Sequence, residues 1–162
     1  MVRPWTAADL EPLVRHANNP RVAIHLRDRF PHPYRRQDGQ RFLTAVLRAA
    51  RPTVWCIEVD GQAAGGIGIE LRDDVERVSA EIGYWLGEAC WGRGVTTAAL
   101  VAVTDEAFRM FDLRRLFAVP FAENAASVRV LEKAGYVLEG HMRQSAVKDG
   151  RLLDQLMYAK YR

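Results

Sequence analysis

Two Asp-Gly dipeptides constrain the fold of this chain more than any other feature, because each lies between two strand-like runs. Asp60-Gly61 separates residues 53–59 from residues 62–71, and Asp149-Gly150 lies between the last two apolar runs. Asp and Gly tolerate the positive φ angles that a two-residue hairpin turn requires. We therefore expect an antiparallel hairpin at each of these sites.

A strand–helix–strand unit lies between the two hairpins. Residues 78–86 form a strand-like run, residues 95–111 carry apolar side chains at helical spacing, and residues 116–120 are short and apolar. Such a unit predicts a crossover within a sheet. Gly65-Gly66, inside one of the earlier strands, predicts a bulge or a close backbone approach.

Three further helices are expected from the spacing of apolar residues. One follows Thr6, which has Asp9 as an imperfect capping-box partner, and the others cover residues 38–50 and 124–134. Two prolines exclude regular helix from residues 27–33, so this segment either connects elements or lines a ligand cleft.

The resulting order of elements is β-α-α-β-β-β-α-β-α-β-β. It predicts an α/β (α+β) layer fold, with a mixed, mostly antiparallel sheet of about seven strands flanked by helices. The strict alternation of a doubly wound sheet is absent. A length of 162 residues suits one domain, so we expect residues 1–162 to form a single domain.

Composition narrows the classes of function. The chain is 49% hydrophobic and 27% charged, and it has no apolar run of the ~18 residues that a membrane span needs. The N-terminal residues lack the layout of a secretion signal, so we expect a cytoplasmic protein. Two separate cysteines and four scattered histidines do not indicate a metal site. The net charge of +3 is mild and the arginines are dispersed, which argues against nucleic-acid binding but suits a small polyanionic ligand.

The segment CWGRGVTTAAL, residues 90–100, predicts an anion site. Gly92 and Gly94 allow a ligand to approach the backbone closely, and the helix that follows begins with amides that lack intrahelical partners. These amides and the helix dipole attract a phosphate group. Arg93 adds a guanidinium, and Thr96 and Thr97 add hydroxyls. The simpler alternative is a turn whose bend the glycines ease.

Several phosphate ligands compete for this loop. A P-loop would need a lysine, which is absent, and a dinucleotide-binding loop would need a third glycine, where this chain has threonine. Glu123 lies where a ribose-binding acid would be wanted, so NAD stays a minor alternative. The antiparallel strands before the loop disfavour NAD, because a dinucleotide-binding unit is built from parallel strands.

Two linked segments, AEIGYWLGEACWGRGVTTAAL and ENAASVRVLEKAGYVLEG, resemble the GNAT superfamily of acyl-CoA-dependent N-acyltransferases. The resemblance is closest to the branch that acetylates the N-terminal amines of ribosomal proteins (alanine or serine). It implies that the family segment Q/R-x-x-G-x-G/A, which binds the pyrophosphate of acetyl-CoA through main-chain amides, is matched here by Trp91, Gly92, Arg93, Gly94, Val95 and Thr96. Trp91 and Thr96 depart from the family pattern, whereas Gly94 retains it.

The resemblance also implies the path of the cofactor. Tyr84, Trp85 and Leu86 are expected beside the pantetheine arm, to which they would offer backbone hydrogen bonds. Asn124 matches an asparagine that contacts the arm in the family, and Ser127 matches the serine of N-x-x-S-x-x-x-L-E-K-x-G. Both residues are equally suited to cap and start a helix.

The implied reaction is attack of a neutral amine on a thioester, which needs oxyanion donors and a proton for the leaving thiolate. Backbone amides at the end of residues 78–86 are candidate donors. Many family members have a tyrosine acid where this chain has Leu131, so Ser127 or water takes that role. Glu81 and Glu70, acting through a bound water, are candidate bases. The remaining assignments are Asp154 as a weaker base candidate and Tyr136 as a packing residue.

These expectations combine into one function. The chain is expected to transfer an acetyl group from acetyl-CoA, with no metal, to a primary amine. A peptide or protein N-terminus is favoured, because an α-amine of pKa about 8 is deprotonated more cheaply than a lysine at about 10.4. A small-molecule amine is also open. The alternative is a non-catalytic acyl-CoA-binding or sensing module. We expect a monomer or homodimer with no nucleic-acid or membrane partner.

Overall fold

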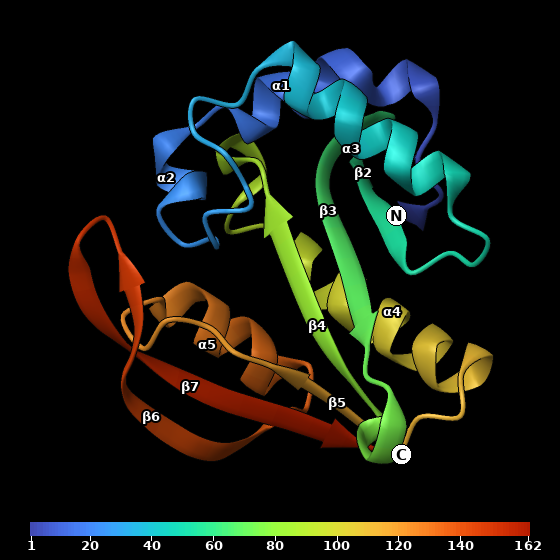
Figure 1. The fold of residues 1–162 in the computed structure, drawn as a ribbon. Coiled ribbons are helices and arrows are strands. Elements are labelled where there is room, and N and C mark those ends of the chain that lie inside the picture. Colours follow the sequence, from blue (N-terminus) through green and yellow to red (C-terminus); the bar gives the residue numbers. More distant parts are fainter.

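The computed structural model describes residues 1–162 as one seven-stranded sheet, in the order β1-β2-β3-β4-β5-β7-β6, flanked by helices (Figure 1). The strands are β1 (Val2–Arg3), β2 (Val54–Val59), β3 (Gln62–Leu71), β4 (Ser79–Leu86), β5 (Arg115–Ala118), β6 (Val137–Lys148) and β7 (Arg151–Tyr161). The helices are α1 (Leu10–Ala17), α2 (Pro20–Ala23), α3 (Arg36–Arg48), α4 (Val95–Met110) and α5 (Ala125–Lys133). Every pairing in the sheet is antiparallel except that of β4 with β5. The predicted fold class is confirmed.

Both hairpin turns form where the Asp-Gly pairs predict them. Asp60 and Gly61 have φ angles of 50° and 77°, and Asp149 and Gly150 have 50° and 74°. The close approach predicted at Gly65-Gly66 is also present, because a Cβ atom on Gly65 would overlap the carbonyl oxygen of Trp85. The register of β2 and β3 shifts at the same place, next to Ile57.

Two details of the helices differ from the sequence prediction. The second long helix begins at Arg36 and not at residue 38, because the Asp38 carboxylate accepts the backbone N–H of Arg35 and so lies inside the first turn. The short helix α2 was not predicted. Pro20 occupies its first turn, where proline needs no hydrogen-bond partner, and the Asn19 side chain caps it by accepting the N–H of Arg21.

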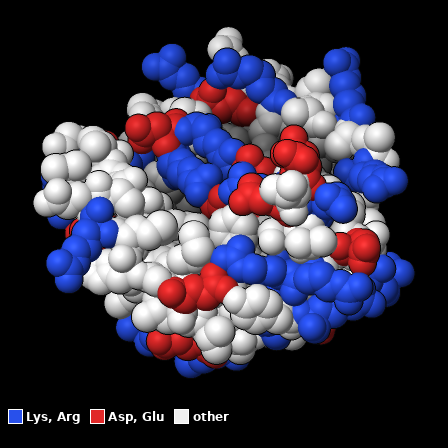
Figure 2. All heavy atoms as spheres, turned by 60° about the horizontal axis from the view of Figure 1, so that its bottom comes forward, with Lys and Arg blue, Asp and Glu red and all other residues white.

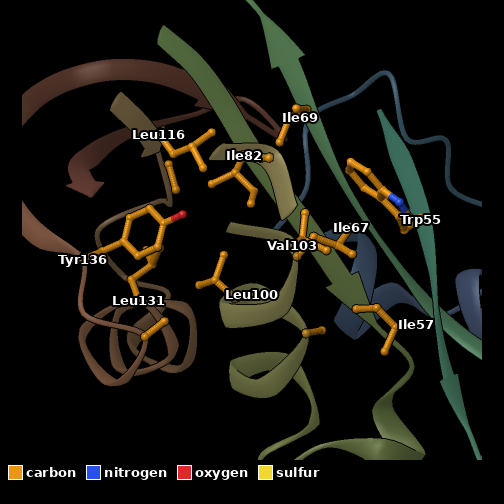
Figure 3. Close-up of a cluster of buried hydrophobic side chains, with 14 of the residues drawn as sticks. Trp55, Ile57, Ile67, Ile69, Ile82, Leu100, Val103, Leu116, Leu131 and Tyr136 are labelled. Atoms are coloured by element: carbon orange, nitrogen blue, oxygen red, sulfur yellow. The ribbon is translucent and has the colours of Figure 1, made fainter. Parts of the chain in front are cut away.

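The core has two parts, one on each face of the sheet. The larger part lies between α4 and the strands, and Figure 3 shows Ile67, Ile82 and Leu116 pointing toward Leu100 and Val103 of α4. The smaller part packs α1 and α3 on the opposite face, around Leu13 and Leu43. Alternation along β4 therefore places Ile82 and Tyr84 on the α4 side, and leaves Glu81, Gly83 and Trp85 on the other face.

Strands β4 and β5 are paired over only part of their length. Their register covers Ser79, Ala80 and Glu81 of β4, and the two strands then diverge toward the end of β4 (Figure 1). The last residues of β4 keep their antiparallel pairing with β3 on the other edge. This divergence leaves backbone groups of β4 without a strand partner, and the candidate functional site lies there.

Candidate functional site

A cleft of about 1110 Å³ begins where β4 and β5 separate, and extends between β3, β4, α5 and the loop between α2 and α3. Most of the residues that the sequence singles out line it. They are Glu70, Glu81, Tyr84, Trp85, Leu86, Trp91, Gly92, Thr96, Asn124 and Ser127. Part of the predicted cofactor loop and the predicted catalytic residues therefore face one continuous space.

The start of α4 has the geometry of an anion site. Gly92 and Gly94 have φ angles of 74° and 73°, a left-handed conformation that side chains other than glycine rarely adopt. The first hydrogen bond of the helix runs from the N–H of Ala98 to the carbonyl of Gly94, so the amides of residues 95–97 have no helical acceptor. Their N–H groups and the helix dipole favour a negatively charged ligand at this end.

The side chains of the loop divide between two directions. Thr96 faces the main cleft, whereas Gly94 and Thr97 line a shallower groove beside it. Arg93 forms an ion pair with Asp60 at 3.2 Å, so its guanidinium lies toward the β2–β3 turn. Val95 packs against the larger core.

Trp91 has a role that sequence reasoning missed. Its indole Nε1 donates a hydrogen bond of 2.7 Å to the carbonyl of Leu86, and the Arg21 guanidinium lies 5.6 Å from the centre of the ring. The residue that departs from the family pattern therefore fixes the glycine loop to the end of β4. The signal in the sequence was the five-residue spacing between a strand end and a tryptophan, which alone is not specific.

The register of β3 and β4 decides which backbone groups of β4 face the cleft. Arg72 donates its N–H to Ser79, and Gly87 donates its N–H to Ala64, so the odd-numbered residues of β4 bond to β3. The backbone groups of Tyr84 and Leu86 then point toward the diverging β5, whereas those of Trp85 do not. The Trp85 backbone, which was predicted to contact the pantetheine arm, thus faces β3 and not the cleft. The Trp85 side chain does line the cleft.

A pair of hydroxyl groups bridges β4 and α5. The hydroxyls of Tyr84 and Ser127 lie 2.8 Å apart, and burial raises the pKa of the Tyr84 phenol, which keeps it protonated. The Asn124 side-chain oxygen accepts the N–H of Ser127, so Asn124 caps α5 while it lines the cleft. Its amide nitrogen is not used by the cap.

The residue at the family's tyrosine position offers no acid group. Leu131 is completely buried, and its aliphatic side chain belongs to the larger core. Tyr136 is also buried, and its hydroxyl lies 2.7 Å from that of Thr104, which confirms the prediction that Tyr136 is a packing residue.

The candidate bases lie in different electrostatic surroundings. Both carboxylate oxygens of Glu81 are engaged, one by Arg27 and the other by Arg72 at 3.0 Å. Glu70 uses only Oε2, which accepts from both terminal nitrogens of Arg29 at 3.2 Å.

Glu81 is therefore held as an ion-pair centre, whereas Glu70 keeps one oxygen open. Asp154 does not line the cleft. It accepts from the N–H of Gln144 and lies 2.6 Å from His141 on the last hairpin.

No group of three or more His, Cys, Asp or Glu side chains is arranged to hold a metal ion. None of the helices combines the length and the apolar character required to cross a membrane.

Comparison with known proteins places the chain among acetyltransferases. Residues 1–137 match the family model of the acetyltransferase (GNAT) domain. An uncharacterised N-acetyltransferase p20 of Bacillus licheniformis is 35% identical over 98 residues, which cover 60% of this chain and 54% of that protein. The ribosomal-protein-serine acetyltransferase of Escherichia coli is 33% identical over 96 residues, or 58% of this chain and 54% of that protein. The match thus spans about half the length of these curated relatives.

The fold has close counterparts among solved structures. One is the ribosomal L7/L12 alpha-N-protein acetyltransferase RimL in complex with coenzyme A. It superposes with a TM-score of 0.87 at 24% identity, over 99% of this chain and 92% of that chain. The mostly antiparallel seven-stranded sheet therefore belongs to a known fold. Together with the family match over most of the chain, this establishes that the chain belongs to the GNAT acetyltransferase family.

Proposed function

We propose that this protein transfers the acetyl group of acetyl-CoA to a primary amine, and that the amine is the N-terminus of a peptide or protein. The observation that carries the proposal is the single cleft, which runs from Gly92 and Thr96 at the start of α4 to the carboxylates Glu70 and Glu81. Acetyl-CoA is a long donor whose phosphates and thioester lie at opposite ends, so it can occupy both parts of this cleft at once.

The donor is held by groups that need no particular side chains. The pyrophosphate binds to the N–H groups of residues 95–97 and to the loop at Gly92. The pantetheine arm follows the edge of β4, where Tyr84 presents its N–H and carbonyl and Leu86 presents its N–H, none of them paired with a strand. RimL, whose fold is the same, is known in complex with coenzyme A.

The reaction is attack of the neutral amine on the thioester carbon. A C–N bond forms, the carbonyl becomes a tetrahedral oxyanion that the β4 amides stabilise, and the C–S bond then breaks. Glu70, through its open oxygen and a water molecule, accepts the proton that the amine loses. Ser127 passes a proton to the thiolate and regains one from solvent water, and Tyr84 orients the serine hydroxyl.

The acceptor is an α-amine for energetic reasons. An α-amine has a pKa of about 8, so at neutral pH its deprotonation costs about 1–1.5 kcal/mol, against roughly 4–5 kcal/mol for a lysine side chain. A site with one open carboxylate and no tyrosine acid suits the cheaper acceptor. The Escherichia coli relative, a ribosomal-protein-serine acetyltransferase, has a protein acceptor.

Calorimetry and a thiol-release assay test the proposal together. Acetyl-CoA should bind one site per chain, and short peptides with a free N-terminus should release coenzyme A at a rate far above that of hydrolysis. N-formylated peptides of the same sequence, as the control, should release none. If acetyl-CoA bound but no amine caused release of coenzyme A, the protein would be a non-catalytic acyl-CoA-binding module. Absence of acetyl-CoA binding would contradict the proposal altogether.

A further inference from the structure

The face of the sheet that carries the candidate bases has a patch of glycines without side chains. Gly66 and Gly68 of β3 and Gly83 of β4 share this face with Glu70 and Glu81, and Gly83 is directly opposite Gly68 in the register. A Cβ atom on Gly68 would press against Val54 and the carbonyl of Thr53, which explains that glycine by packing.

Gly83 has no such explanation. A Cβ atom there would have no heavy atom within 4 Å, and its φ angle is not in the left-handed region that favours glycine. Glycine weakens the interior of a strand, and it often marks a place where another molecule approaches the backbone. The space above Gly83 belongs to the cleft.

Three aromatic rings form the wall on one side of this space. The Trp85 indole lies over Gly66, since a Cβ atom on Gly66 would be 2.8 Å from the indole nitrogen. Phe30, from the α2–α3 loop, packs edge-on against Trp85 with ring centres 5.4 Å apart, and Tyr34 lies 5.0 Å from Phe30. All three line the cleft, and burial raises the pKa of Tyr34 to about 12, so this wall is uncharged.

The opposite side of the same space carries two carboxylates, each paired with arginine, and Glu70 keeps one oxygen open. Glu81 is two residues before Gly83 on the same face, roughly 7 Å away at the rise of an extended strand, and Glu70 is its partner across the register. An acceptor above Gly83 therefore has carboxylates on one side and aromatic rings on the other. An α-amine that carries an apolar side chain matches this arrangement, with its amine toward the carboxylates and its side chain toward the rings.

We propose that the pocket above Gly83 selects α-amines whose α-carbon carries a large apolar side chain, aromatic ones above all. This inference rests on the proposed function and names its acceptor class. The same chemistry is found at the end of a peptide and in a free hydrophobic amino acid.

The test compares acceptors that differ at one side chain. Initial rates of coenzyme A release with acetyl-CoA would be measured for tetrapeptides that begin with Phe, Leu or Ala and are otherwise identical. We expect kcat/KM for the Phe peptide to exceed that for the Ala peptide by on the order of tenfold or more, because burial of the larger side chain stabilises the bound acceptor. Free phenylalanine and free alanine, as a second pair, show whether the preference extends beyond peptides.

Two substitutions connect the preference to the pocket. Gly83→Val adds a β-branched side chain that the strand tolerates and that fills the space, and Phe30→Ala removes part of the wall. Either change should lower the Phe-to-Ala ratio of kcat/KM by about tenfold. The matched control is Gly140→Val on β6. A Cβ atom on Gly140 also meets nothing within 4 Å, and the residue does not line the cleft, so the ratio should stay unchanged.

The results separate the two proposals. Transfer to Ala peptides at a rate equal to or above that of Phe peptides would overturn the inference and leave the proposed function standing. An equal loss for both peptides in Gly83→Val and in Phe30→Ala, with a raised KM for acetyl-CoA, would mean that these residues serve the thioester and would also overturn it. No transfer to any amine would overturn both.

Discussion

Gly94 is the residue on which donor binding depends most strongly, because its left-handed backbone aims the first amides of α4 at the ligand. Asp and Asn both tolerate this left-handed conformation better than most other side chains do. A comparison of the two substitutions therefore isolates the effect of the negative charge from that of backbone strain. We expect Gly94→Asp to raise KM for acetyl-CoA about tenfold more than Gly94→Asn does, since only Asp repels the phosphates. Equal effects of the two substitutions, measured by calorimetry and kinetics, would contradict the anion site.

The two glutamates should respond differently to loss of charge. Glu81→Gln leaves Arg27 and Arg72 without their shared partner, so it should lower the free energy of unfolding by about 1 kcal/mol. Glu70→Gln should change stability little, because its pair with Arg29 is exposed, but should lower kcat at neutral pH. Denaturant melts and rates for both variants check this assignment, and a larger fall in kcat for Glu81→Gln would reverse it.

The pair formed by Tyr84 and Ser127 predicts a graded loss. Ser127→Ala should lower kcat by less than the roughly 100-fold typical of a lost general acid, because a thiolate is a tolerable leaving group. Tyr84→Phe should lower it less than that, and should have little further effect in the Ser127→Ala background. Additive losses in this double-mutant cycle would show that the two hydroxyls act independently.

At the residue scale, the sequence predicted what depends on local geometry. The glycine loop, the cap at Asn124 and the structural role of Tyr136 each follow from neighbours within a few positions. The ion pair of Glu81 with Arg27 joins residues 54 positions apart, and no local pattern indicates it. The choice between Glu70 and Glu81 therefore needed the fold.

At the scale of elements, β3 and β4 are in tight contact at Gly65, next to Gly66 and Leu86, which line the cleft. Gly65→Ala places a methyl group against the carbonyl of Trp85 and 3.0 Å from the Cα of Leu86, and backbone cannot move away as a flexible side chain does. We expect a loss of about 1–3 kcal/mol in the free energy of unfolding, measured by denaturant titration. Gly140→Ala, whose methyl group meets nothing, is the control and should change stability by less than about 0.5 kcal/mol.

The start of α1 depends on a charge. Arg3 donates two hydrogen bonds of 2.8 Å to Asp9, and this guanidinium is the main reason that the pKa of Asp9 lies below its ordinary value. A lowered folded-state pKa adds stability above the unfolded pKa of about 3.9, and this stability is lost as the pH falls through the folded value. Asp9→Asn should therefore cost about 2 kcal/mol at pH 7, and the cost should shrink as the pH falls through the lowered folded-state pKa, in denaturant melts at a series of pH values. A cost that is independent of pH would contradict the ion pair.

The helices and strands that depend on local signals were predicted well from the sequence. The order of the strands within the sheet was not. The Asp-Gly turns determined both hairpins, and the crossover through α4 was expected from its helical spacing. The insertion of β7 between β5 and β6 depends on pairing between distant segments, which no turn signal specifies. The same holds for the divergence of β4 from β5, which creates the cleft.

At the scale of the whole molecule, charge is distributed in pairs. Figure 2 shows basic and acidic side chains side by side over much of the face that it draws. Many of them form ion pairs, among them Arg115 with Glu139 and Arg151 with Glu123. The net charge of +3 is small, so we expect selective attraction of the polyanionic donor to come from the start of α4.

The central claim is that one cleft joins an acetyl-CoA site to an amine site. The most direct measurement is mass spectrometry of a short peptide after incubation with the protein and acetyl-CoA, with coenzyme A release followed in parallel. We expect a peptide heavier by one acetyl group on its N-terminal α-amine, in equal amount to the coenzyme A released, and no product with Gly94→Asp at low acetyl-CoA. Release of coenzyme A without an acetylated amine, or no release in the presence of any amine, would contradict it.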